Sequence, residues 1–177
     1  RNWLMQNQKE ADAHKIFTAV LAEDPDNTFA QASLYDYYRA KNNDAMATQL
    51  RDKMLISPKT DNETKLSIMK QVVQESERTG GDSTAVLALF DKITSANPND
   101  GNMAELKAAY MSVKNMPDSL VNNALRQVVA VAPENTGARL QLIQSLWKKQ
   151  RWDEILTLSK QAQAYTPEEM VFYYFEG

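Results

Sequence analysis

The sequence predicts an all-α protein built from consecutive helix hairpins, and three observations support this prediction. The chain has 177 residues but only 5 Gly and 6 Pro, which are too few turn residues for a many-stranded β fold. Most of its prolines recur at similar intervals. Its apolar residues follow helical spacing, as in Leu66, Met69 and Val73.

Five prolines divide the chain into repeat units, because proline blocks the continuation of a helix and disfavours helical geometry in the residue before it. They follow one another at intervals of 33, 40, 35 and 34 residues: Pro25, Pro58, Pro98, Pro133 and Pro167. We therefore expect about four full units, with a partial unit at each end. The expected units are 1–25, 26–58, 59–98, 99–133, 134–167 and 168–177.

A weaker break near the middle of each full unit divides it into two helices. In chain order the breaks are Lys41-Asn42-Asn43-Asp44, Gly80-Gly81-Asp82, Met116-Pro117-Asp118 and Gln150-Arg151. The extra residues of the 40-residue interval are expected to lengthen one helix, from about Asn62 to Arg78. Beyond the last full unit, Thr166-Pro167-Glu168-Glu169 is a capping box that predicts a new helix from Pro167, cut off at Gly177.

The second helices of four units share one spacing. A small or aliphatic residue is followed four positions later by a larger one, three later by another small or aliphatic residue, and five later by proline. Four segments keep this spacing: Ala13, Phe17, Val20 and Pro25; Val86, Phe90, Ile93 and Pro98; Val121, Leu125, Val128 and Pro133; and Ile155, polar Ser159, Ala162 and Pro167. The unit that ends at Pro58 fits worst.

This pattern resembles the tetratricopeptide repeat (TPR) family, whose 34-residue helix pairs stack into a superhelix. The resemblance covers the whole chain, and counting back from Pro25 puts Arg1 inside a first helix. It departs from the family at Tyr35 and Ile143, where a small residue is usual, and the repeat register within 59–133 stays open by about one to two residues. HEAT-type helix pairs and the 35-residue RNA-reading repeats have nearby periods, and the acidic balance disfavours the latter.

The resemblance implies a non-enzymatic module that binds a peptide or protein segment on its concave face, which first helices line. Binding residues are then expected at first-helix positions that packing does not use. These are Phe29, Asp36, Arg39, Gln71, Gln74, Lys107, Met111, Lys114, Gln144, Trp147 and Lys148. Trp147 is the strongest candidate, because rigid aromatic anchors are common hot spots. The Lys and Asn clamp by which some TPR domains hold a carboxylate is absent.

Composition excludes several classes of site. With no Cys and a single His, His14, the chain cannot form a thiol nucleophile, a disulfide or a site that needs two imidazoles, and we expect no cofactor or metal. A net charge of -3 disfavours sequence-independent binding of nucleic acid. No uncharged apolar run approaches the roughly 18 residues of a membrane helix, so no membrane insertion is expected. The basic patch at 147–152 is more simply read as solvated Lys and Arg at a helix end.

Two other functions stay open: a structural spacer or oligomerisation scaffold without a groove ligand, and a regulatory arm of an enzyme encoded outside these residues. The apolar and aromatic segment Met170–Phe175 is expected either to self-associate or to fold back on the preceding helix. The first residues form neither a signal peptide nor an initiator-Met start, so we expect a fragment of a longer chain. The Cys-free, Asn- and Gln-rich composition looks similar to bacterial TPR proteins, with the cytoplasm and the cell envelope or periplasm equally open.

Overall fold

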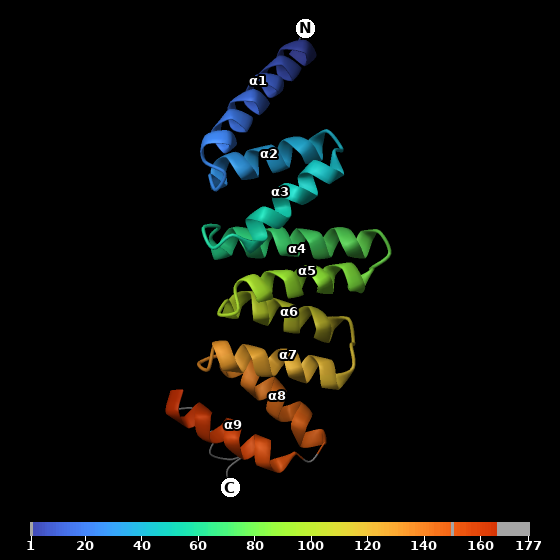
Figure 1. Ribbon diagram of the computed structural model, residues 1–177. Coiled ribbons are helices and arrows are strands. Elements are labelled where there is room, and N and C mark those ends of the chain that lie inside the picture. The colour runs from blue at the N-terminus through green and yellow to red at the C-terminus, as the bar shows by residue number, and fades with distance from the viewer. Residues whose placement is uncertain (1, 150, 166–177) are drawn as a thin grey trace. The chain divides into compact units, whose positions relative to one another are not determined.

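The computed structural model describes residues 2–149 and 151–165, and every regular element in these two ranges is an α-helix (Figure 1). The predicted all-α class is confirmed. Successive helices pack on one another within each compact part of the chain. The helices are α1 (Asn2–Glu23), α2 (Thr28–Ala40), α3 (Asp44–Ile56), α4 (Asn62–Arg78), α5 (Ser83–Ala96), α6 (Gly101–Val113), α7 (Asp118–Val131), α8 (Thr136–Lys148) and α9 (Trp152–Tyr165).

Helix ends fall at the breaks that the sequence predicts. Pro25, Pro58, Pro98 and Pro133 each lie in a turn between two helices. After three of these proline turns and after two mid-unit breaks, an asparagine or aspartate side chain caps the next helix by accepting a backbone N–H, which satisfies a donor that the first turn leaves free. These caps are Asn27, Asn43, Asp82, Asp100 and Asn135. Pro167 and the segment Met170–Phe175 lie outside the described residues.

The long helix of the 40-residue interval is confirmed, since α4 runs from Asn62 to Arg78. It ends before Gly80 and Gly81, whose φ angles of 115° and 72° lie in the left-handed region that glycine enters without strain. Two mid-unit turns use asparagine in the same region, at Asn42 and Asn115. Local turn chemistry therefore sets most helix boundaries in the described residues.

The start of the chain differs from the prediction. Counting back from Pro25 put Arg1 inside a first helix, distinct from the second helix that carries Ala13, Phe17 and Val20, but α1 is one continuous helix of 22 residues. The physical reason is that residues 2–23 contain no glycine or proline to interrupt it. The spacing residues Ala13, Phe17 and Val20 lie on this helix and are only half-buried.

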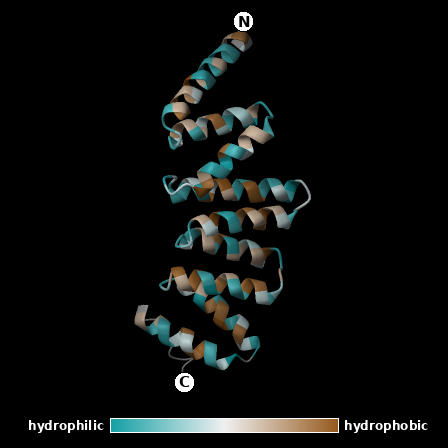
Figure 2. Cartoon of the chain, viewed as in Figure 1, coloured by the Kyte–Doolittle hydropathy of each residue, from teal (hydrophilic) through white to brown (hydrophobic). Residues whose placement is uncertain are grey.

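The chain forms two compact units, Arg1–Thr79 and Gly80–Gly177, each with its own buried residues. In the first unit, α2, α3 and α4 bury Leu34, Leu50, Met54, Leu55 and Met69, among others. In the second unit, a continuous core runs from α6 to α9. Each helix also carries hydrophilic residues, as the alternation of teal and brown in Figure 2 shows.

In the second unit, the residues that share the spacing described for second helices form the buried stripe of those helices. Its members in this unit are all buried: Val86, Phe90, Ile93, Val121, Leu125, Val128, Ile155, Ser159 and Ala162. Tyr35 and Ile143, where the TPR pattern has a small residue, are buried as well. Burial raises the pKa of Tyr35 above its ordinary value.

A short segment occurs twice and forms the same contact each time. Pro25-Asp26-Asn27-Thr28-Phe29-Ala30-Gln31 corresponds to Pro133-Glu134-Asn135-Thr136-Gly137-Ala138-Arg139. In the first copy, Nε2 of Gln31 donates to the Pro25 carbonyl at 2.8 Å. In the second, Nη2 of Arg139 donates to the Pro133 carbonyl at 2.7 Å. A buried polar side chain thus ties each helix to the proline turn before it.

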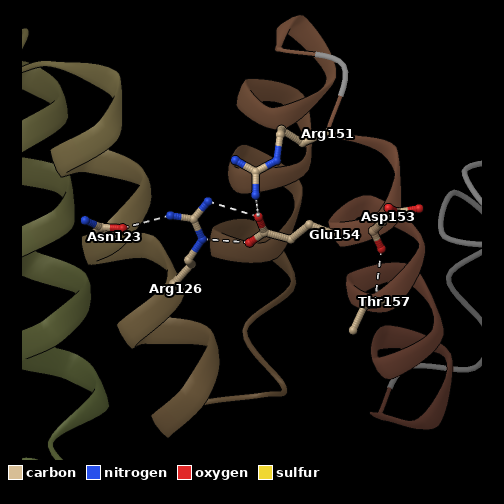
Figure 3. Close-up of polar contacts among 6 residues, drawn as sticks. All are labelled: Asn123, Arg126, Arg151, Asp153, Glu154 and Thr157. Carbon is tan, nitrogen blue, oxygen red and sulfur yellow. Dashed lines mark hydrogen bonds and ion pairs between the residues drawn. The ribbon is translucent and has the colours of Figure 1, made fainter.

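An ion pair fixes α9 to α7 in the second unit (Figure 3). Arg126 donates to both carboxylate oxygens of Glu154, from Nε at 2.6 Å and from Nη2 at 3.0 Å. Its Nη1 also donates to Asn123, and Arg151 lies 3.6 Å from Glu154. The hydrogen bonds from Arg126 hold the pKa of Glu154 below its ordinary value of 4.5.

This ion pair predicts a pH-dependent contribution to stability. Because the pKa of Glu154 is lower in the folded chain than in the unfolded chain, its contribution is complete above the unfolded pKa and is lost as the pH falls through the folded pKa. Glu154→Gln should lower the free energy of unfolding by about 1 kcal/mol at neutral pH, and the difference from the native chain should shrink below about pH 4.

Urea denaturation across this pH range measures the effect, and Glu105→Gln, which changes an exposed glutamate of α6, is the matched control. The control should follow the native chain at every pH. A Glu154→Gln difference that stays constant as the pH falls would contradict the assignment.

Candidate functional site

The second unit contains an open groove of about 810 Å³ between α6 and α8. We call it the α6–α8 groove. Its floor is formed by the buried α7 residues Val121, Asn122 and Leu125. The other lining residues are Ser112, Asn115, Met116, Asp118, Gln141, Gln144, Ser145, Trp147 and Lys148.

One wall of the groove is a polar stripe on α8. Gln141, Gln144 and Lys148 are spaced by three and four residues, which places them on one face of a helix. The opposite face of α8 carries the buried residues Leu142 and Leu146. Nε2 of Gln141 lies 3.4 Å from Oγ of Ser112 on α6, so the two walls are joined at this point.

Trp147 is the aromatic residue of the groove. It is 43% exposed, and its ring meets that of Trp152 edge-on, with the ring centroids 4.6 Å apart. Trp152 is the first residue of α9 and does not line the groove, so its ring packs against that of Trp147 from outside the groove. Exposed Lys148 and Lys149 follow Trp147, and exposed Arg151 precedes Trp152.

Asn122 is the polar residue of the floor. It is 2% exposed, and its Oδ1 has no hydrogen-bond partner among the residues that the structure describes. A buried acceptor without a donor is unfavourable, so a donor that reached this atom would be stabilised. Sequence reasoning missed Asn122. One signal in the sequence could have identified it, because Asn122 is a polar amide residue that lies between Val121 and Leu125, in the apolar stripe of a predicted second helix.

The structure brings three predicted site residues together in the α6–α8 groove: Gln144, Trp147 and Lys148. Lys114 is half-buried at the end of α6, between the lining residues Ser112 and Asn115. Met111 is 6% exposed and belongs to the core, contrary to the expectation of a free position, because α6 packs against both α5 and α7. Lys107 is largely buried, and its Nζ pairs with Asp91 on α5 at 2.7 Å.

The remaining predicted residues belong to the first unit. Arg39, Gln71 and Gln74 line a second hollow of about 660 Å³ between α2 and α4. Arg39 already has two partners there, because its guanidinium pairs with Glu75 and lies 5.5 Å from the ring centroid of Tyr35.

Phe29 and Asp36 are exposed and line neither hollow. The ring of Phe29 packs against that of Phe17, with the centroids 5.6 Å apart. His14, the one histidine of the chain, lies 2.9 Å from the hydroxyl of Tyr38 and so contributes to the contact between α1 and α2.

In residues 2–149 and 151–165, no three His, Asp or Glu side chains converge so that they could hold a metal ion. No helix within this part of the chain combines the length and the apolar character that a bilayer crossing needs.

A scan of protein-family models and a search of curated proteins found no match to this chain.

Proposed function

We propose that this protein is an interaction module that binds an extended peptide segment of a partner protein in the α6–α8 groove. The observation that supports this most strongly is the lining of the groove, which combines an exposed indole ring with amide side chains. Amides can both donate to and accept from a peptide backbone, and a rigid aromatic ring supplies apolar contact area. The volume of about 810 Å³ is also within the usual range of ligand sites.

The groove suits binding better than catalysis. Asp118 is the one carboxylate among its described lining residues, and His14 lies on α1 in the other unit. General acid-base chemistry usually needs a second titratable group within reach of the first. The TPR-like spacing agrees with a binding role, because α6 and α8 are the first helices of two successive expected repeats.

A second candidate function, an oligomerisation scaffold, is favoured by α1. This helix exposes Trp3, Leu4, Met5 and Ile16, each with more than half of its surface in contact with solvent. Apolar side chains gathered on one helix are typical of surfaces that another chain covers. Under this alternative the chain should show a concentration-dependent mass in light scattering, and the change Trp3→Ala should reduce it.

Selection of random-sequence peptides on the immobilised chain tests the proposed function. Peptides that are retained should bind Trp147→Ala about 30-fold more weakly, because truncation of an aromatic hot spot costs about 2 kcal/mol or more. Trp3→Ala, on a helix of the other unit, is the matched control and should bind as the native chain does. Retained peptides that bind Trp147→Ala unchanged, or the retention of none, would contradict the proposal.

A further inference from the structure

The chemistry around the groove also indicates which peptides it selects. Resting on the function proposed above, we infer that the α6–α8 groove selects an acidic peptide segment with a large apolar residue. In this arrangement the apolar residue packs on Trp147, acidic side chains face the neighbouring lysines and arginine, and a backbone N–H donates to Asn122. Each of the three contacts corresponds to a separate feature of the structure.

The first feature is the charge at the rim. Lys148 lines the groove, and Lys149 and Arg151 are exposed in the turn that follows α8. Lys114 is half-buried at the end of α6. Asp118 on the lining and Asp153 at the start of α9 are the acidic residues nearest to them in the chain. Glu154 is bound by Arg126 and also lies 3.6 Å from Arg151, so Lys148 and Lys149 carry most of the basic character of the rim. The rim is thus basic in a chain whose net charge is -3, and it complements an acidic ligand.

The second feature is the apolar part of the groove lining. The ring of Trp147 is 43% exposed, and its edge-on contact with Trp152 restricts its orientation. Met116 lines the same groove, and its thioether adapts readily to neighbouring side chains. An aromatic or large aliphatic side chain would cover this surface, as an anchor residue does at the centre of a protein interface.

The third feature is the unpartnered acceptor. Oδ1 of Asn122 is buried in the floor without a donor among the described residues. An extended peptide carries N–H donors along its backbone and can supply one at this point whatever its side chains are. Exposed Gln144 on the wall can pair with a neighbouring peptide group. These contacts would fix the position of the peptide, while charge and the apolar anchor determine which sequences bind.

Three synthetic peptides test this inference by fluorescence anisotropy. The first has a central phenylalanine flanked by aspartate and glutamate, the second replaces the acidic residues by their amides, and the third replaces phenylalanine by alanine. The first should bind about tenfold more tightly than either of the others, and its affinity should fall as salt is added.

Variants of the chain locate the contacts. Lys148→Glu together with Lys149→Glu should weaken binding of the acidic peptide about tenfold more than binding of the amide peptide. Both positions are exposed, so the fold should be retained, as circular dichroism can show. Lys70→Glu, at an exposed position on α4, is the matched control. Asn122→Val should weaken binding of the acidic peptide and of the amide peptide equally, because it removes an acceptor for the backbone N–H that both peptides carry.

The outcomes separate this inference from the function on which it rests. If peptides from the random selection need Trp147 but bind equally well without acidic residues, the groove binds peptides and the acidic selectivity is wrong. If neither the selected peptides nor the acidic probe binds, both proposals fail. Single-stranded DNA or phosphatidylserine vesicles that bind more tightly than the acidic peptide, and lose binding in the double lysine variant, would overturn the choice of a protein partner.

Discussion

Arg139→Ala is expected to lower the free energy of unfolding of the second unit by about 3–5 kcal/mol. Arg139 is 1% exposed and connects three parts of the unit. Its Nη2 donates to the Pro133 carbonyl, and its Nη1 donates to the Leu158 carbonyl at 3.0 Å and to Oε1 of Gln161 at 3.3 Å. Alanine would leave these acceptors without this donor and would create a cavity in the core.

Two further variants show whether the loss of hydrogen bonds causes the destabilisation of Arg139→Ala. Arg139→Lys should be intermediate, because one ammonium group cannot reproduce the planar fork of the guanidinium. Gln31→Ala, at the corresponding position of the repeated segment in the first unit, should cost only about 1 kcal/mol, because a neutral hydrogen bond is lost. Guanidinium denaturation gives the free energies, and amide hydrogen exchange in α9 reports the second unit alone. Unchanged exchange in α9 of Arg139→Ala would contradict the assigned role.

Phe90→Ala is expected to lower the free energy of unfolding by about 3–5 kcal/mol. Phe90 is fully buried on α5, and its ring centroid lies 5.7 Å from that of Tyr110 on α6. It occupies the large position of the shared spacing, so its removal would leave a cavity where the two helices pack.

The matched control for this variant is Phe29→Ala. Phe29 is 72% exposed, and its substitution should change the free energy of unfolding by no more than about 0.5 kcal/mol. Phe90→Leu, which keeps most of the buried volume, should cost about 1 kcal/mol. Equal effects of Phe29→Ala and Phe90→Ala in denaturation experiments would contradict the assignment of the core.

Helix boundaries could be predicted because they depend on local chemistry. Proline interrupts a helix at any position beyond the first turn, and Asn27 or Asp100 caps one through bonds to residues only three positions away. The length of α4 followed from the same reasoning. The prediction for the start of the chain relied on repeat counting instead, and it was wrong because no residue within α1 interrupts the helix.

The groove could be predicted only in part, because it depends on contacts between helices. Spacing along α8 placed Gln144, Trp147 and Lys148 on accessible positions, and the structure brings these three together. Spacing along α6 did not reveal that Met111 is buried, since that depends on how α6 packs against its neighbours. Asn122 was missed because the prediction considered first helices alone, whereas the floor belongs to a second helix.

The indole N–H signals of the chain test the central claim, that the α6–α8 groove binds a peptide, most directly. The chain has three tryptophans, so a ¹H–¹⁵N correlation spectrum shows few indole signals, and single substitutions can assign them. Trp147 lines the groove, whereas Trp3 lies on α1 in the other unit. On titration with a selected peptide, we expect the Trp147 signal to shift until saturation while the Trp3 signal stays in place. A Trp147 signal that does not move when the peptide is fully bound would contradict the claim.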